Sequence, residues 1–164
     1  MKGVVFNLLE SFIQERFGPE TLEQVLEQCT FTTTEPFVGP GTYPDADLLQ
    51  FASKAASHTG VRLDEAVKEF GRYCFPRLLS MLGAPGRYTD SRSLLRELDS
   101  VVHVEVRKLM RGARAPQFTT RDTGPQTLTL EYRSNRKMCA FLEGLLVGMA
   151  EHFHEDVTMR HERC

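Results

Sequence analysis

The chain has 164 residues, 41% of them hydrophobic, which is typical of one domain with a single core. Lysine and arginine total 20 and aspartate and glutamate total 22, so the net charge of −2 gives no support to nucleic-acid binding, which needs a basic surface. No run of about 18 apolar residues is present, so we expect no membrane-spanning helix. We therefore expect one domain, residues 1–164, that binds neither nucleic acid nor membrane.

The N-terminus and the cysteines both predict a cytoplasmic protein. The apolar N-terminal stretch is interrupted by Glu10 and Glu15, which is not typical of a secretory signal peptide. The four cysteines are too few and too scattered for the disulfide framework of a secreted domain, so we expect core thiols or metal ligands.

Helices are predicted over most of the first two thirds of the chain. Apolar residues recur every three or four positions in residues 4–13, and Gly18-Pro19 ends this first helix. The four further predicted helices cover residues 19–29, 44–60, 63–82 and 93–110. Pro76 is expected to kink or divide its helix, and the Thr-, Pro- and Gly-rich residues 30–43 predict a loop.

Beyond the fifth helix the pattern changes from helical to alternating. Residues 117–121 and 126–134 alternate apolar and polar side chains around a turn at 122–125, which predicts a β-hairpin. A last helix is predicted over residues 136–153, and residues 155–164 begin like a strand that has no further strand to pair with. We expect an α+β fold in which an N-terminal helical bundle packs on a C-terminal antiparallel sheet and helix.

Three polar side chains, Tyr132, Ser134 and Arg136, occupy every second position at the end of the hairpin. On an extended strand such positions share one face. A phenol, a hydroxyl and a guanidinium all donate hydrogen bonds to oxygen, and the guanidinium does so as a fork. The row therefore suits one or two carboxylates or phosphates; the alternative is a solvated polar face.

His103 lies inside the helix predicted for residues 93–110. Val106 and Met110 give this helix a partly apolar face, and Asp99 lies one turn before the histidine. An imidazole in such a place can bind a metal through one nitrogen. The alternative is a surface histidine or a hydrogen-bonded core histidine.

Cys139, His161 and Cys164 form a third group of candidate ligands. Two thiolates and an imidazole are typical zinc ligands, and His161-x-x-Cys164 is compact enough to chelate. A structural zinc site is normally four-coordinate, and no fourth candidate follows residue 164. The alternatives are a buried thiol at Cys139 with a disordered tail, and a redox-sensitive Cys139–Cys164 disulfide.

No sequence signature of an enzyme is present. The chain has no Ser–His–Asp arrangement, no glycine-rich phosphate loop and no HExxH motif. Asp45 and Asp47 lie at a predicted helix start, where capping explains them. We therefore expect a non-catalytic protein.

Together these features resemble the haem-nitric oxide/oxygen binding (H-NOX) family, which includes the sensor domain of soluble guanylate cyclase. The most specific feature is Tyr132-x-Ser134-x-Arg136 at its distance after His103. The other matching features extend the resemblance over nearly the whole chain: Met1-Lys2-Gly3, Phe70-Gly71, Leu98-Asp99, Gly112-Ala113, Pro116 and Lys137-Met138.

The resemblance implies a b-type haem buried between the N-terminal helices and the C-terminal sheet. His103 matches the proximal ligand of the haem iron. Tyr132, Ser134 and Arg136 match the residues that bind the two haem propionates, and Pro116 matches the proline that presses on the porphyrin and distorts it. A metal ligand and an anion clamp are what a haem requires of its protein.

The resemblance also implies which gas is bound. Oxygen-binding members carry a distal tyrosine on the last helix, and the corresponding residue here is Phe141. The other expected distal residues are apolar or weak donors: Val5, Leu9 and Cys74. Because a hydrogen-bond donor stabilises bound O₂ much more than NO or CO, we expect an NO-selective sensor that binds NO and CO and excludes O₂. Asn7 or Tyr73 would change this expectation if either turned into the pocket.

In the family, NO binding releases the proximal histidine. The resemblance thus implies that His103 leaves the iron, that strain at Pro116 falls, and that the helix around residues 93–111 shifts. The signal would pass to a separate effector, either a histidine kinase or a cyclic-di-GMP enzyme.

Some members with this resemblance also bind zinc, and Cys139, His161 and Cys164 match three of the four ligands. The fourth cysteine and the last strands of the family's sheet are missing, so we expect C-terminal truncation or loss of the zinc. The alternative function is a zinc or thiol redox switch built on these three residues, with weak or absent haem.

Overall fold

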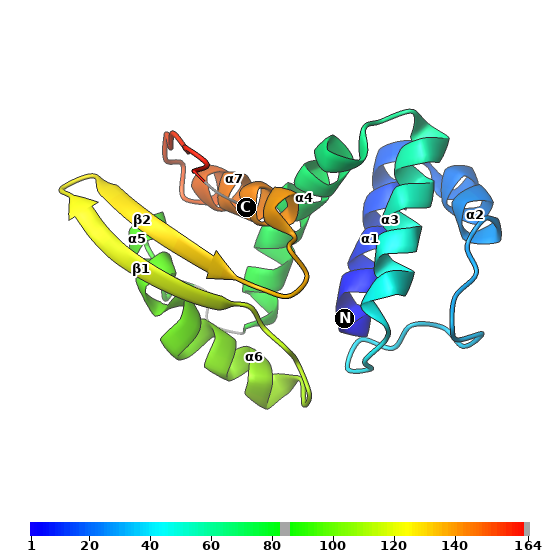
Figure 1. Cartoon of the computed structure of the whole chain (residues 1–164), viewed down its shortest axis with the longest axis horizontal. Helices are drawn as coiled ribbons and strands as arrows, with labels where there is room; N and C mark the ends of the chain where they lie inside the picture. Colours follow the sequence, from blue (N-terminus) through cyan, green and yellow to red (C-terminus); the bar gives the residue numbers. More distant parts are fainter. Residues whose placement is uncertain (83–85, 163–164) are drawn as a thin grey trace.

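The computed structural model describes residues 1–82 and 86–162 (Figure 1). In this part of the chain the helices are α1 (Gly3–Phe17), α2 (Pro19–Glu27), α3 (Asp45–Thr59), α4 (Leu63–Met81), α5 (Ser91–Glu97), the π-helical turn η1 (Leu98–Val102), α6 (His103–Leu109) and α7 (Cys139–His152). The strands are β1 (Gln117–Gly124) and β2 (Thr127–Arg133). The expected α+β class is confirmed. None of the described helices is long and apolar enough to cross a membrane.

The N-terminal lobe, residues 1–62, consists of α1, α2, α3 and a loop that returns along the start of the chain (Figure 1). Gly18 has a φ of +94°, which ends α1 and lets Pro19 begin α2 at the position proline favours. Lys2 pairs with Thr42 of the loop in an isolated antiparallel bridge. The N-terminus is therefore held against the loop rather than free.

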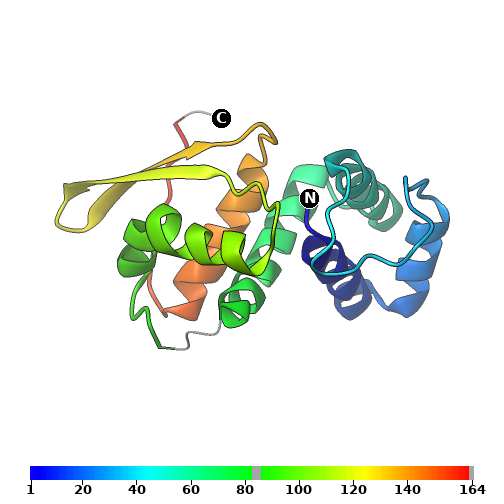
Figure 2. The same cartoon turned by 90° about the horizontal axis from the view of Figure 1, so that it is seen from below.

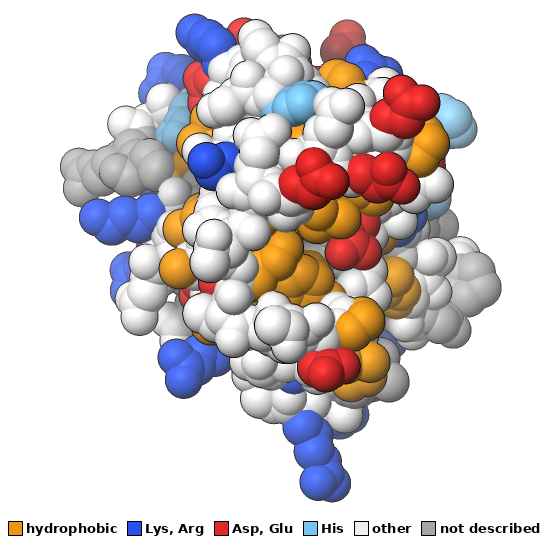
Figure 3. Space-filling view, turned by 90° about the vertical axis from the view of Figure 1, so that its right-hand side faces the viewer, with side chains coloured by type: hydrophobic (Ala, Val, Ile, Leu, Met, Phe, Trp, Pro, Cys, Tyr) orange, Lys and Arg blue, Asp and Glu red, His pale blue; other side chains and the backbone are white. Residues whose placement is uncertain are grey.

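The core of this lobe is largely aromatic. Phe6 is fully buried, and its ring stacks on that of Phe37 with 4.1 Å between centroids. Tyr43 packs edge-on against Phe6 at 5.6 Å. The outer face of the lobe exposes apolar side chains in its middle, with acidic side chains around them (Figure 3).

Helices α4 and α7 pack with their backbones in contact, more extensively than any other pair of described elements. A Cβ on Gly144 of α7 would overlap the carbonyl oxygen of Lys68, and one on Gly71 of α4 would overlap that of Phe141. Glycine at both positions therefore permits the close approach. Since α4 also packs on α3 and α1, this contact joins the two ends of the molecule.

The C-terminal lobe, residues 86–162, contains the hairpin, the α5–η1–α6 rod and α7. Strands β1 and β2 are antiparallel, with Phe118 opposite Tyr132 and Gln117 opposite Arg133. The hairpin lies alongside the rod, and β1 contacts η1 (Figure 2). The rod replaces the uninterrupted helix predicted for residues 93–110, because η1 introduces a π turn into it.

Other boundaries also differ from the sequence predictions. Pro76 does not divide α4, which continues through it. The last helix begins at Cys139 because Lys137, with a φ of +50°, and Met138 are not helical. Residues 155–162 contain no strand, so that prediction is wrong for the described part of the tail. An isolated strand without a hydrogen-bonded neighbour is not stable, and the hairpin does not extend to this segment.

We predict that Gly144→Ala destabilises the protein by about 1–3 kcal/mol, because overpacking against a neighbouring backbone cannot be relieved by a rotamer change. The higher helix propensity of alanine, worth about 1 kcal/mol, offsets only part of this cost. Urea denaturation measures the free energy of unfolding. Gly39→Ala is the control, since nothing lies within 4 Å of a Cβ there; equal stability of the two variants would contradict the prediction.

Candidate functional site

His103 is the first residue of α6 and directly follows the π turn η1, a feature frequent at functional sites. Its side chain is 11% exposed, and Nδ1 lies 3.4 Å from Oδ1 of Asp99. Burial lowers the pKa of His103, and hydrogen bonding to Asp99 and to the Pro116 backbone opposes this shift without overcoming it. The imidazole is therefore neutral at pH 7, which is the form that binds metals.

Two aromatic rings of the hairpin form a row of ring contacts that begins at His103. The ring centroid of Phe118 lies 5.4 Å from that of the imidazole, and the ring of Tyr132, opposite Phe118 in the register, lies 5.4 Å further on. The structure thus brings together His103, Tyr132 and the backbone of Pro116. Sequence reasoning missed Phe118, although the alternation in residues 117–121 placed it on a strand.

Ser134 and Arg136 lie beyond the end of β2, so the prediction that they share one strand face with Tyr132 is wrong. The reason is that β1 begins at Gln117, opposite Arg133, and offers no ladder to later residues. The backbone N–H of Arg136 instead donates to Oγ of Ser134 at 3.2 Å. This turn directs the Arg136 side chain toward the N-terminal lobe.

Arg136 connects the two lobes through two hydrogen bonds. Its Nε donates to Oδ2 of Asp45 at 2.8 Å, and its Nη1 donates to the carbonyl oxygen of Arg114 at 2.7 Å. The amine of Met1 donates to Oδ1 of Asp45 at 2.5 Å. Burial would raise the pKa of Asp45, but its bonds to the amine and to Arg136 outweigh burial and hold the pKa below its ordinary value. Asp45 is therefore part of an ion-pair network rather than the helix cap we expected.

The expected distal residues meet in one apolar cluster where α1, α4 and α7 come together. Leu9 and Cys74 are buried, and Val5 and Phe141 are half-buried. The ring of Phe141 lies 5.4 Å from that of Phe70. Burial raises the pKa of the Cys74 thiol well above its usual range, so the thiol stays protonated and is at most a weak donor.

Two stronger polar groups occur near this cluster. The Tyr73 hydroxyl donates to Oε1 of Glu15 at 2.6 Å and is thereby committed to an exposed carboxylate. Oδ1 of Asn7 is buried and has no hydrogen-bond partner in the described part of the chain.

A hollow of about 470 Å³ opens beside Arg136, between α3, α4 and the start of α7. Leu9 and Phe70 belong to its lining, so it borders both the cationic group and the apolar cluster. His103 does not line it. The assignment of a metal-binding imidazole therefore depends on the geometry around His103 itself.

The described residues do not assemble a zinc site. Cys139 begins α7, and Nδ1 of His161 lies 2.6 Å from Oε1 of Glu143. Cys164, on which both the zinc set and the Cys139–Cys164 disulfide depend, lies outside the described residues. Over residues 1–82 and 86–162, no group of three or more His, Cys, Asp or Glu residues is arranged to hold a metal ion. The zinc alternative therefore has no support.

Comparison with known proteins identifies the family. A family model described as Haem-NO-binding matches residues 2–161. The chain belongs to this family. An H-NOX protein from S. oneidensis in the Fe(II)NO ligation state is 28% identical, with a TM-score of 0.92 over 100% of this chain and 91% of that one. An unliganded Fe(II) H-NOX protein from K. algicida is 26% identical, with a TM-score of 0.82 over 94% of this chain and 84% of that one.

One relative is a much longer protein, with a sequence identity similar to that of the two H-NOX proteins. Soluble guanylate cyclase 89Db of Drosophila melanogaster is 27% identical over 161 residues, which is 94% of this chain and 23% of that protein. The chain thus spans less than a quarter of that cyclase. What matches is a haem-based gas-sensor fold, which is a sensor domain and not itself catalytic.

The donor set of this H-NOX domain fits a haem. A neutral imidazole suits the iron, a guanidinium already ordered by Asp45 suits a carboxylate, and an apolar cluster suits the porphyrin. Sequence reasoning missed the ion pairs of Asp45 with Arg136 and with the Met1 amine, which hold the guanidinium in place. No local signal could have revealed them, since Asp45 and Arg136 are 91 residues apart.

We predict that Asp45→Ala and Arg136→Ala are not additive in their effect on stability. In a double-mutant cycle on the haem-free protein at pH 7, urea denaturation should give a coupling of about 0.5–1 kcal/mol, discounted because Asp45 is 43% exposed. The pKa of Asp45 in the folded protein is lowered from its ordinary value of 3.8. The ion pair therefore stabilises the fold fully above pH 3.8, and this contribution is lost as the pH falls through the lowered pKa. Additive single effects at pH 7 would contradict the ion pair.

Proposed function

We propose that residues 1–164 form a single, non-catalytic, haem-based sensor of nitric oxide. The observation that carries the proposal is the buried, neutral His103, set between Asp99 and the aromatic row that leads to Tyr132. Membership of the Haem-NO-binding family supports it. We place the protein in the cytoplasm.

Specific residues would hold a b-type haem. His103 would ligate the iron through a ring nitrogen, with Asp99 orienting the ring. Tyr132, Ser134 and Arg136 would bind the propionates, and Pro116 would press on the porphyrin. The haem, when bound, supplies the iron at which a diatomic gas binds.

The distal residues would select the gas. Val5, Leu9 and Phe141 offer no hydrogen-bond donor, and Cys74 offers a weak one. Tyr73 is occupied by Glu15. Bound O₂ needs a donor much more than NO or CO does, so this set favours NO and CO and excludes O₂.

The signal would arise at His103. His103 would hold the iron in the resting state; on its release the strain at Pro116 would fall and α6 would move, as a two-state element biased by the bound gas. We propose that the output passes to a separate effector, either a histidine kinase or a cyclic-di-GMP enzyme.

The ligand assignment is tested with His103→Ala. Purified ferrous protein should lose its haem or its Soret band, because the variant offers no axial nitrogen, and imidazole supplied during expression should restore both. Ultraviolet–visible spectra and the haem-to-protein ratio measure this. His58→Ala, an exposed histidine of α3, is the control. Full haem loading of His103→Ala without imidazole would reject the assignment.

The gas selectivity is tested by restoring a donor. Phe141→Tyr should raise the affinity of the ferrous protein for O₂ about tenfold, the equivalent of one net hydrogen bond. The wild-type protein and Phe141→Leu should form no stable oxy complex in air. Spectra at increasing O₂ pressure give the affinities, and a stable oxy complex of the wild-type protein would overturn the selectivity argument.

A further inference from the structure

Lys2 is a buried lysine whose partners in the described chain are neutral oxygens. The residue is 8% exposed, and Nζ donates to the carbonyl oxygen of Pro40 at 2.9 Å, to Oγ1 of Thr42 at 2.7 Å and to the carbonyl oxygen of Arg111 at 2.5 Å. An ammonium group has three donors, so its capacity is filled. Because a buried charge without hydrogen bonds is very unfavourable, these three oxygens determine where the ammonium lies.

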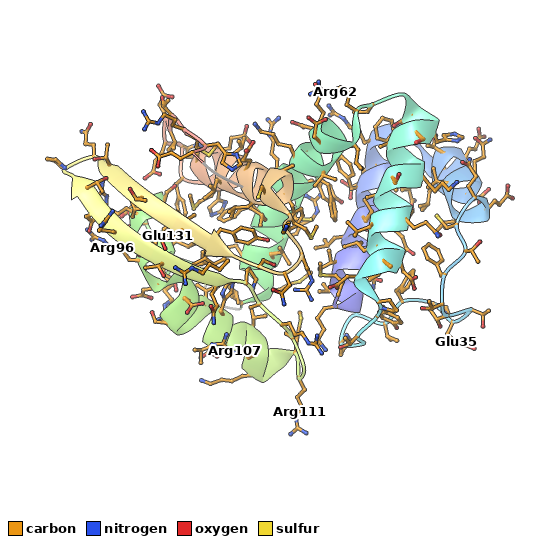
Figure 4. The ribbon with its side chains drawn as sticks, viewed as in Figure 1. Glu35, Arg62, Arg96, Arg107, Arg111 and Glu131 are labelled. Carbon is orange, nitrogen blue, oxygen red and sulfur yellow. The ribbon has the colours of Figure 1, made fainter. Side chains whose placement is uncertain are left out.

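The third acceptor lies in a different part of the molecule. Pro40 and Thr42 belong to the loop of the N-terminal lobe, whereas Arg111 follows α6 and is 109 residues from Lys2. The side chain of Arg111 points away from the body of the protein (Figure 4), and it is the backbone carbonyl oxygen of this residue that accepts from Lys2. Lys2 thereby bonds the N-terminal lobe to the end of the helix that carries His103.

A second cation holds the same segment. Arg136 donates to the carbonyl oxygen of Arg114, three residues after Arg111. Arg136, however, also pairs with Asp45 and is the residue that would bind a propionate. All three donors of Lys2 are bonded to oxygens of the chain, and Lys2 is not among the residues that would bind a propionate. Its hold on the segment after α6 is therefore independent of how Arg136 is engaged.

We propose that Lys2 is a positioning residue that ties the end of the His103 helix to the N-terminal lobe and thereby opposes the release of His103. This inference rests on the proposed function, in which α6 moves when His103 is released. Such movement must stretch or break the bond from Lys2 to Arg111, since Pro40 and Thr42 keep the ammonium in the N-terminal lobe. A buried, charge-assisted bond of this kind favours the state in which it is intact.

The test measures histidine release directly. In Lys2→Met, which keeps the apolar stem and removes the ammonium, the equilibrium between histidine-bound and histidine-free ferrous nitrosyl haem should shift about tenfold toward the histidine-free form. Absorption spectra over a range of temperatures give the equilibrium. The iron–histidine stretching frequency of the unliganded ferrous protein should also fall. A carboxy-terminal tag keeps the Met1 amine native, as its bond to Asp45 requires.

Two control variants separate tethering from loop folding. Thr42→Val removes one bond of Lys2 within the N-terminal lobe and leaves the bond to Arg111, so its equilibrium should stay close to wild type. Lys54→Met removes an exposed lysine of α3 and should have no effect. If Lys2→Met does not fold, Lys2→Gln, which keeps a shorter donor, should give a smaller shift in the same direction.

Hydrogen exchange tests the tether by a readout that does not depend on the haem spectrum. In the protein as purified, amide exchange of residues 110–114 should be about tenfold faster in Lys2→Met than in Lys54→Met. Unchanged exchange, an unchanged nitrosyl equilibrium, or an equal shift in Thr42→Val would each overturn the proposal. Failure of the wild-type protein to bind haem through His103 would instead reject the proposed function, and the exchange measurement would still decide whether the tether exists.

Discussion

The contact between the backbones of α4 and α7 is the constraint on which the site depends. Gly71 and Gly144 allow the two helices to meet without side chains between them. As a result the start of α7 lies close to α1, and Phe141 joins Leu9 and Cys74 in one apolar cluster. The chain must turn sharply before α7 to reach this position, and that turn places the guanidinium of Arg136 against Asp45.

The α5–η1–α6 rod is hydrogen-bonded to other parts of the molecule at both of its ends. At its start, the backbone N–H of Ser91 donates to the carboxylate of Glu155, beyond α7, at 3.2 Å. After its end, the carbonyl oxygen of Arg111 accepts from Lys2 of the N-terminal lobe. His103 lies between these anchors, directly after the π turn. Because the rod is bonded at both ends, a displacement of His103, the proposed haem ligand, would be passed to both lobes.

The polar and apolar halves of the site come from different elements. The imidazole, the phenol and the guanidinium belong to α6, the hairpin and the turn that follows it. The apolar cluster belongs to α1, α4 and α7. This separation leaves charge and hydrogen bonding on one side and a donor-poor surface on the other, and the proposed selectivity for NO rests on that division.

Local sequence patterns determined much of this protein. The periodicity of residues 4–13, proline at the start of α2 and the alternation on either side of residues 122–125 identified helices and hairpin, because helix and strand periods are properties of neighbouring residues. The spacing of His103 and Tyr132-x-Ser134-x-Arg136 identified the family and the candidate ligands.

Only the tertiary structure decided the features that depend on distant contacts. The π turn η1 and the end of β2 before Ser134 depend on which groups lie opposite in space, and periodicity carries no information about that. The same holds for Asp45, whose partners Met1 and Arg136 are 44 and 91 residues away, and for Lys2, bonded to a carbonyl oxygen 109 residues away. Charged groups that are buried or partly buried find such partners only when the whole chain is folded, since removal from water creates the need for them.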